Sequence, residues 1–290
     1  MTTNRWISPL VAFTALAWGL SWVIWLPQIA EAKGWIEGPA SIYFHLIGGI
    51  GPMVAGILVT WRWSGRAGLR RLARQSTAVR DWRWNTIGLL GPVVLFFVAV
   101  VITRIADGVW PNLSRFGASE EYATLGISLY WLANLVFYGF GEEIGWRGVL
   151  LPRLQAHMHA LPATLIVALI WTLWHVPSFT FVPGYVAMDL AGFVGLFFSF
   201  LTGALIMTWI YNGSGGNLLA LALFHASLDI TINTPTGSDM LYTAYGAAIT
   251  VAGIAVLLRY GWRNLAHAPR VTEPVVETKQ PDAVFEVGFS

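Results

Sequence analysis

The chain has no cysteine, and only 11% of its 290 residues are charged. Without cysteine it can form no disulfide, no thiolate nucleophile and no cysteine-ligated zinc site. An average soluble protein carries roughly 25% charged residues, so this composition argues against a soluble globular fold. The formal net charge of +2 says little about partners, and we expect no nucleic acid among them.

Hydrophobic residues are abundant instead, at 56% of the chain, with 16 Trp and 16 Phe. A membrane-spanning helix needs roughly 20 largely apolar residues. Eight segments meet or approach this requirement: 6–27, 40–61, 86–106, 124–141 (running on through a charged motif), 161–181, 189–211, 216–232 and 241–258. The pattern predicts an all-α, polytopic membrane helix bundle of about eight transmembrane helices. We therefore expect a multi-pass integral protein of the cell membrane.

The arginines indicate the orientation of these spans. Cytoplasmic connections carry an excess of Lys and Arg. The second connection is the richest, with Arg62, Arg66, Arg70, Arg71, Arg74, Arg80 and Arg83, while Arg5, Arg153, Arg259, Arg263 and Arg270 fall on the same side of an eight-span arrangement. Both termini are thus predicted to be cytoplasmic. We expect residues 1–259 to form the transmembrane domain and the polar, proline-containing residues 260–290 to form a flexible cytoplasmic tail.

Three charged residues stand at the end of the fourth apolar segment, in Gly141-Glu-Glu-Ile-Gly-Trp-Arg-Gly148. A charge at the centre of a spanning helix costs roughly 2.5–3.5 kcal/mol on insertion scales. Glu143 and Arg147 are separated by four residues, so they share one helix face and can neutralise each other. Glu142 lies about 100° around the helix from Glu143. The spacing predicts a supporting ion pair, Glu143 with Arg147, and a Glu142 that is free to act.

Further polar groups lie on other spans. His175 is on the fifth, His225 and Asp229 are four residues apart on the seventh, and His45 is on the second. If the spans pack together, Glu142, His175, His225 and Asp229 can converge. A desolvated Glu beside a His can deprotonate a water. A second His with an Asp could then stabilise an oxyanion. These are the components of a water-attack amide hydrolase.

The residues alone leave alternatives open. Glu142, His175 and His225 could instead hold a divalent metal such as zinc, although the His-Glu-x-x-His motif is absent. We favour no cofactor. The double glutamate could serve only as a structural ion pair in a non-catalytic membrane scaffold. A proton-coupled transporter is a third alternative, although no inverted repeat is evident. His45 alone is typical of an interhelical hydrogen-bond partner.

Together the three motifs resemble the CPBP family, also called the Abi or CAAX-protease family, which includes the type II prenyl endopeptidases. The resemblance covers about residues 125–235. It rests on Glu142-Glu143-x-x-x-Arg147, on an aromatic residue four positions before His175 (Trp171-x-x-x-His175), and on His225-x-x-x-Asp229. It implies an eight-span protein whose site opens towards the cytoplasm. It also implies that Glu142 and His175 activate water, His225 and Asp229 stabilise the oxyanion, and Glu143 and Arg147 support the site.

Two residues depart from the family pattern. Trp171 stands where Phe is usual, and Asp229 stands where the prenyl endopeptidases carry Asn. With the resemblance, the sequence predicts an intramembrane endopeptidase that cleaves near the cytoplasmic membrane face, with CAAX-type or other membrane-associated peptides as substrates. A glutamate mechanism is favoured over a metalloprotease. The expected partners are membrane lipids and a peptide or lipidated-protein substrate, and a bacteriocin-immunity-like scaffold is the main alternative.

Overall fold

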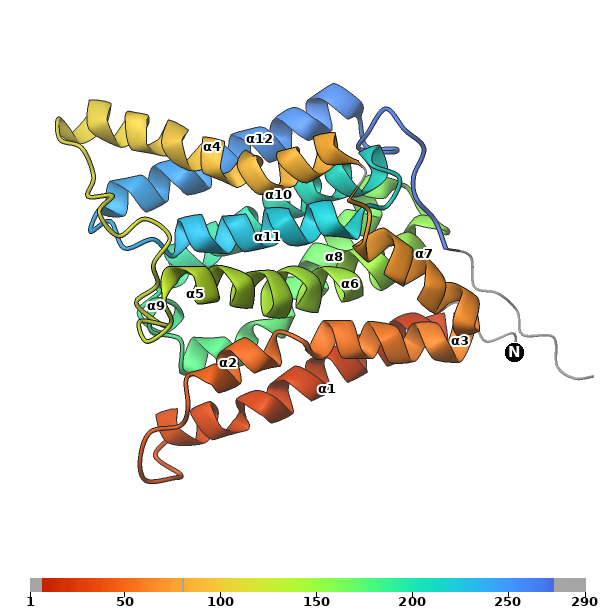
Figure 1. Ribbon diagram of the computed structural model, residues 1–290, viewed down its shortest axis with the longest axis horizontal. Coiled ribbons are helices and arrows are strands. Elements are labelled where there is room, and N and C mark those ends of the chain that lie inside the picture. Colours follow the sequence, from red (N-terminus) through yellow and green to blue (C-terminus); the bar gives the residue numbers. More distant parts are fainter. Residues whose placement is uncertain (1–6, 80, 274–290) are drawn as a thin grey trace, which may run out of the picture.

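The computed structural model describes residues 7–79 and 81–273, and within these ranges the chain is helical and contains no strand (Figure 1). The α-helices are α1 Ile7–Ala32, α2 Tyr43–Gly48, α3 Gly51–Ser76, α4 Trp82–Asp107, α5 Ile127–Ala133, α6 Gly141–Gly145, α7 Leu151–Gln155, α8 Ala160–Trp174, α9 Pro183–Val186, α10 Leu190–Gly213, α11 Leu218–Ile232 and α12 Asp239–Tyr260. Two π-helical segments, η1 Asn134–Phe140 and η2 Trp146–Leu150, and a 3₁₀ turn, η3 Val176–Thr180, complete the list.

The prediction of a polytopic helical membrane protein is confirmed. Six helical stretches are long and apolar enough to cross a membrane: 7–32, 43–76, 82–107, 160–180, 190–213 and 239–260. The predicted seventh span is the shorter apolar helix α11. The predicted fourth span corresponds to the continuous helical run 127–155, from α5 to α7, which we call the motif helix. The protein is thus a multi-pass integral membrane protein.

Close backbone contacts fix the motif helix in the bundle. A Cβ atom on Gly139 would lie 2.6 Å from the carbonyl oxygen of Ala222 in α11, and one on Gly141 would lie 2.8 Å from that of Gly49, beside α2. Only glycine allows such an approach, because any side chain would overlap the facing backbone. The motif helix is therefore held between α11 on one side and the α2–α3 segment on the other.

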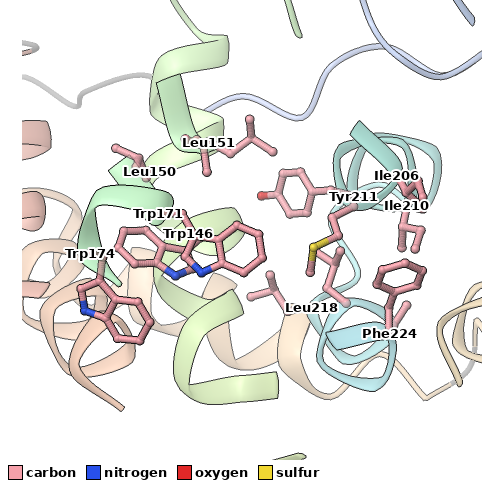
Figure 2. Packing of buried hydrophobic residues seen from close by; sticks show 14 of the residues in the cluster. Trp146, Leu150, Leu151, Trp171, Trp174, Ile206, Ile210, Tyr211, Leu218 and Phe224 are labelled. Atoms are coloured by element: carbon pink, nitrogen blue, oxygen red, sulfur yellow. The ribbon is translucent and has the colours of Figure 1, made fainter. Parts of the chain in front are cut away.

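Large apolar side chains fill the space beside the motif helix, where it meets α8, α10 and α11 (Figure 2). Trp146 is fully buried and contacts Phe13 and Trp174 edge-on, with ring centroids 5.4 and 6.0 Å apart. Tyr211 of α10 and Leu218 of α11 are also fully buried. Buried aromatic rings contribute large contact areas, so this cluster holds the helices that carry the polar motifs in fixed positions.

The first part of the predicted flexible tail packs against the bundle. The backbone N–H of Ala160 donates to the carbonyl of Arg263 at 2.9 Å, and Leu265 is fully buried. Glu273 pairs with Arg71 and, at 3.1 Å, with Arg153. Over residues 261–273 the structure therefore differs from the expected flexible tail, because the segment supplies a carboxylate between two arginines. Residues 274–290, and the predicted cytoplasmic Arg5 and Arg80, lie outside the described residues.

Candidate active site

Glu143 and Arg147 form the predicted ion pair. Nη1 of Arg147 lies 2.8 Å from Oε1 of Glu143, and both side chains are almost completely buried. The guanidinium also lies over the ring of Trp171, 4.9 Å from its centroid. Oε1 of Glu143 accepts a second hydrogen bond from Nδ1 of His225 at 2.8 Å. The pair thus neutralises a buried charge and also anchors a histidine from α11.

Glu142 points to a different set of partners. Its Oε2 accepts hydrogen bonds from the indole N–H of Trp171 at 2.6 Å and from that of Trp146 at 3.2 Å. Its Oε1 lies 4.0 Å from Nε2 of His225. Only 3% of Glu142 is exposed. Two indole donors therefore fix one carboxylate oxygen, while the second oxygen faces His225.

His225 stands between three carboxylates. Because the Glu143 carboxylate can only accept, the His225 Nδ1 carries a proton, and Nε2 is left to face Glu142 and Asp229. Oδ2 of Asp229 lies 3.7 Å from this Nε2. These two separations are longer than direct hydrogen bonds, which extend to about 3.2 Å. The ring is thus held at Nδ1 and presents Nε2 to the two neighbouring acids.

His175 reaches the site from the end of α8. Its Nδ1 lies 2.8 Å from the carbonyl oxygen of Trp171, one turn earlier, so Nδ1 is the donor and Nε2 of the neutral ring carries the lone pair. Its ring stacks on Phe200 of α10 with centroids 4.8 Å apart. Trp171 lies between the two histidines, with centroids 5.8 Å from His175 and 5.6 Å from His225. His175 and Glu142 thus share Trp171 as a common neighbour.

His45 belongs to a neighbouring cluster. Its Nδ1 lies 2.6 Å from Oε1 of Glu121 and 3.3 Å from the hydroxyl of Tyr122, both in the α4–α5 connection. The Tyr122 hydroxyl is 2.7 Å from that of Tyr138 on the motif helix. The side-chain partners of His45 thus lie in a connection and not on another spanning helix, which differs from the interhelical role expected for a lone histidine. Glu121 could not be picked out from the sequence, because it falls in a loop outside every predicted span.

Sequence reasoning also missed the two indoles that hold Glu142. Trp146 lies one helical turn after Glu142, but its packing could not be read from that spacing. Trp171 carried a signal, since it replaces a phenylalanine of the resembled pattern. Phenylalanine cannot donate a hydrogen bond, whereas the Trp171 indole makes the shortest contact to the Glu142 carboxylate. The departure therefore coincides with a direct contact in the site.

Two comparisons with known proteins match part of this chain. A family model described as "Type II CAAX prenyl endopeptidase Rce1-like" matches residues 124–231. A curated relative, CAAX prenyl protease 2 of Methanococcus maripaludis, is 29% identical over 147 residues, which are 49% of this chain and 52% of the relative. Over these residues the chain is similar to the CPBP, or CAAX-protease, family. It spans about half the length of the curated relative that it matches.

The segment that matches the family model carries the polar motifs. Residues 124–231 run from just before the motif helix almost to the end of α11, so they include each of the six residues singled out in the three motifs. Helices α1 to α4 lie outside the match. Of these, α2 carries His45 and packs beside the motif helix.

The zinc alternative needs Glu142, His175 and His225 around one ion. Nδ1 of His175 and Nδ1 of His225 both lie against protein oxygens, so only Nε2 of each ring is available to a metal. Among residues 7–79 and 81–273, no group of three or more His, Asp and Glu side chains could hold a metal ion. The three candidate ligands are therefore not gathered into a metal site in this part of the chain.

Proposed function

We propose that this protein is an intramembrane endopeptidase in which Glu142 activates the water that attacks a peptide bond. The observation that carries the proposal is the pair of indole N–H groups on one oxygen of this buried carboxylate, with a histidine facing the other oxygen. A positioned carboxylate can accept a proton from water and later return it to the leaving amine. The similarity of residues 124–231 to the type II CAAX prenyl endopeptidase family model supports the same reaction.

His175 is proposed as the partner of Glu142 in handling the water. Its Nδ1–H is fixed on the Trp171 carbonyl, so the neutral ring offers Nε2 as a hydrogen-bond acceptor. An acceptor on this side orients the second hydrogen of a water whose first proton moves to Glu142. The stacking of the ring on Phe200 limits its rotation and keeps the acceptor in one direction.

His225 and Asp229 are proposed to face the oxygen of the peptide carbonyl. Glu143, itself paired with Arg147, holds Nδ1 of His225 and thereby sets the direction of Nε2. A protonated ring can donate from Nε2 to an oxyanion, and buried donors of this kind stabilise a tetrahedral intermediate. Asp229 beside Nε2 favours the protonated ring by its negative charge. We propose a membrane-associated or lipidated peptide as substrate, approached within the lipid bilayer.

The test is turnover of a fluorogenic lipopeptide by purified protein in lipid bicelles. Glu142→Gln and His175→Asn should each lower kcat, because a positioned general base contributes roughly 10²–10⁴-fold. Glu37→Gln is the matched control, since Glu37 is exposed in the α1–α2 connection. Thermal unfolding of each variant separates loss of chemistry from loss of fold. Wild-type turnover that survives unchanged in both site variants would overturn the assignment.

A further inference from the structure

A groove runs between α4 and α12 on the outer surface of the bundle, where these two helices cross (Figure 1). Halfway along α4 the helices touch, and the hydroxyl of Tyr245 donates to the carbonyl oxygen of Pro92 at 3.2 Å. Closer to the start of α4 and the end of α12, the ring of Trp209 from α10 contacts both helices, with centroids 5.0 Å from Trp84 and 6.0 Å from Tyr260. The two helices therefore diverge towards this end, where an indole separates them.

The groove is lined by four helices, and Thr86 is its one polar lining residue. Ile206 of α10 and Phe224 of α11, both buried, form its floor (Figure 2). Leu90 and Val256 belong to its two walls, and the volume is about 400 Å³. An empty groove would leave these side chains without contacts on one side, whereas a hydrocarbon chain would supply them. The shape and lining of the groove therefore suit an acyl chain of the surrounding bilayer.

An arginine stands at the diverging end of each wall. On α4, Arg83 precedes the lining residue Ile87 by four positions. On α12, Arg259 follows the lining residue Val256 by three positions. Residues at these spacings share one helix face, so both arginines lie on the faces that line the groove. Both are exposed, and among residues 7–79 and 81–273 neither forms an ion pair.

This end of the groove has the features of a membrane interface. Trp84 and Tyr260 flank it, and Trp and Tyr are enriched at the level of the lipid head groups. Asp81 is the acidic residue nearest to Arg83 in the sequence, while Arg263 follows Arg259 by four positions, so positive charge predominates. By the positive-inside rule this end faces the cytoplasm, whose leaflet carries the anionic lipids.

We infer that this groove binds one anionic phospholipid of the cytoplasmic leaflet. One acyl chain would lie in the groove, and the phosphate would accept charge-assisted hydrogen bonds from Arg83 on one wall and Arg259 on the other. A zwitterionic lipid fills the groove equally well but brings its own ammonium group beside the two arginines, so the site distinguishes lipids by charge. The groove contains none of the six motif residues, and the inference does not depend on the proposed function.

The first test is lipid binding to the delipidated full chain, measured by native mass spectrometry with dioleoyl phosphatidylglycerol and dioleoyl phosphatidylcholine. Near an anionic surface each arginine contributes about fivefold, so the wild type should bind phosphatidylglycerol roughly 30-fold more tightly, at one saturable site. Arg83→Gln and Arg259→Gln should each weaken this binding roughly fivefold. Arg62→Gln is the matched control, since Arg62 is exposed on α3 and lies over Trp63 as Arg83 lies over Trp82. Equal binding of the two lipids, or an equal loss in Arg62→Gln, would overturn the inference.

The second test fills the groove. Gly91 lines it, and a Cβ atom on Gly91 would meet only the ring of Phe224, at an ordinary contact distance of 3.7 Å. Gly91→Leu should therefore fold and abolish saturable binding of both lipids. Gly195→Leu is the control, because Gly195 is exposed on α10 outside the groove and its Cβ would meet nothing within 4 Å.

Thermal unfolding in phosphatidylcholine bicelles shows whether both leucine variants fold, and if Gly91→Leu does not, the arginine variants decide the question alone. Binding of phosphatidylglycerol to folded Gly91→Leu with wild-type affinity would refute the site. An uncharged farnesylated peptide that binds the wild type more tightly than phosphatidylglycerol, and loses this binding in Gly91→Leu, would assign the groove to an isoprenoid chain and overturn the phospholipid assignment.

Discussion

Breaking the buried ion pair of the motif helix should strongly destabilise the bundle. In Arg147→Met the side chain keeps a similar length, but Glu143 loses the cation at 2.8 Å. Removing one partner of a buried pair costs about 3–5 kcal/mol, because the other charge remains buried. His225 still donates to Glu143 at 2.8 Å, so we expect the lower half of that range. A loss of about 3 kcal/mol raises the unfolded fraction by roughly two orders of magnitude.

The assay is equilibrium unfolding in lipid bicelles, followed by intrinsic tryptophan fluorescence. Arg74→Met provides the control, since Arg74 is exposed on α3, and exposed substitutions usually change stability by less than about 0.5 kcal/mol. The double variant Glu143→Gln/Arg147→Met should recover part of the loss, because no unpaired charge remains. If Arg147→Met is as stable as Arg74→Met, or if the two single losses simply add in the double variant, the pair does not carry the stabilisation assigned to it.

Three further predictions concern single side chains. Trp171→Phe removes the shorter hydrogen bond to Glu142 and should lower kcat/KM by roughly 10–100-fold, since a hydrogen bond to a charged group contributes about 1.5–3 kcal/mol. A kcat/KM within twofold of the wild-type value would contradict the role of the Trp171 indole as a donor to Glu142. Asp229→Asn removes a negative charge that would repel the carboxylate of a peptide with a free C-terminus. The ratio of kcat/KM for the free peptide to kcat/KM for its C-terminal amide should therefore rise, and an unchanged ratio would argue against repulsion between Asp229 and the substrate carboxylate. Glu273→Gln leaves Arg153 without its carboxylate partner and should reduce the free energy of unfolding by about 1–3 kcal/mol. The measurement is a thermal melt, and a stability equal to that of the wild type would show that the C-terminal segment docks without this pair.

The sequence predicted best those features that lie within one helix. The apolar segments became helices, and the four-residue spacing of Glu143 and Arg147 placed them in contact, because helical periodicity determines which side chains share a face. The same reasoning correctly separated Glu142 from Glu143. It could not determine their partners on other helices, because periodicity leaves the rotation and depth of one helix against another undefined.

The partners of the two glutamates and the segment after α12 illustrate that limit. Nδ1 of His225 binds Glu143, the residue assigned to support, while Glu142 is held by tryptophans that appeared in the sequence only as apolar residues. Residues 261–273 were expected to be flexible because they are polar and contain proline. Their order depends on Arg71 and Arg153, which lie far away in the sequence and are adjacent only in the folded bundle.

The π-helical segments on both sides of α6 have a consequence for how the site is encoded. A π turn corresponds to one residue inserted into an α-helix, and such insertions recur at functional sites. If η1 kept its residues but wound as an ordinary α-helix, the extra residue would no longer be absorbed and Glu142 would rotate by about 100° relative to α5. Residue identity would be preserved at every motif position, yet the carboxylate would leave its indole donors. The winding of η1 is therefore part of what places the site, and an alignment that scores only residue types would overlook its loss.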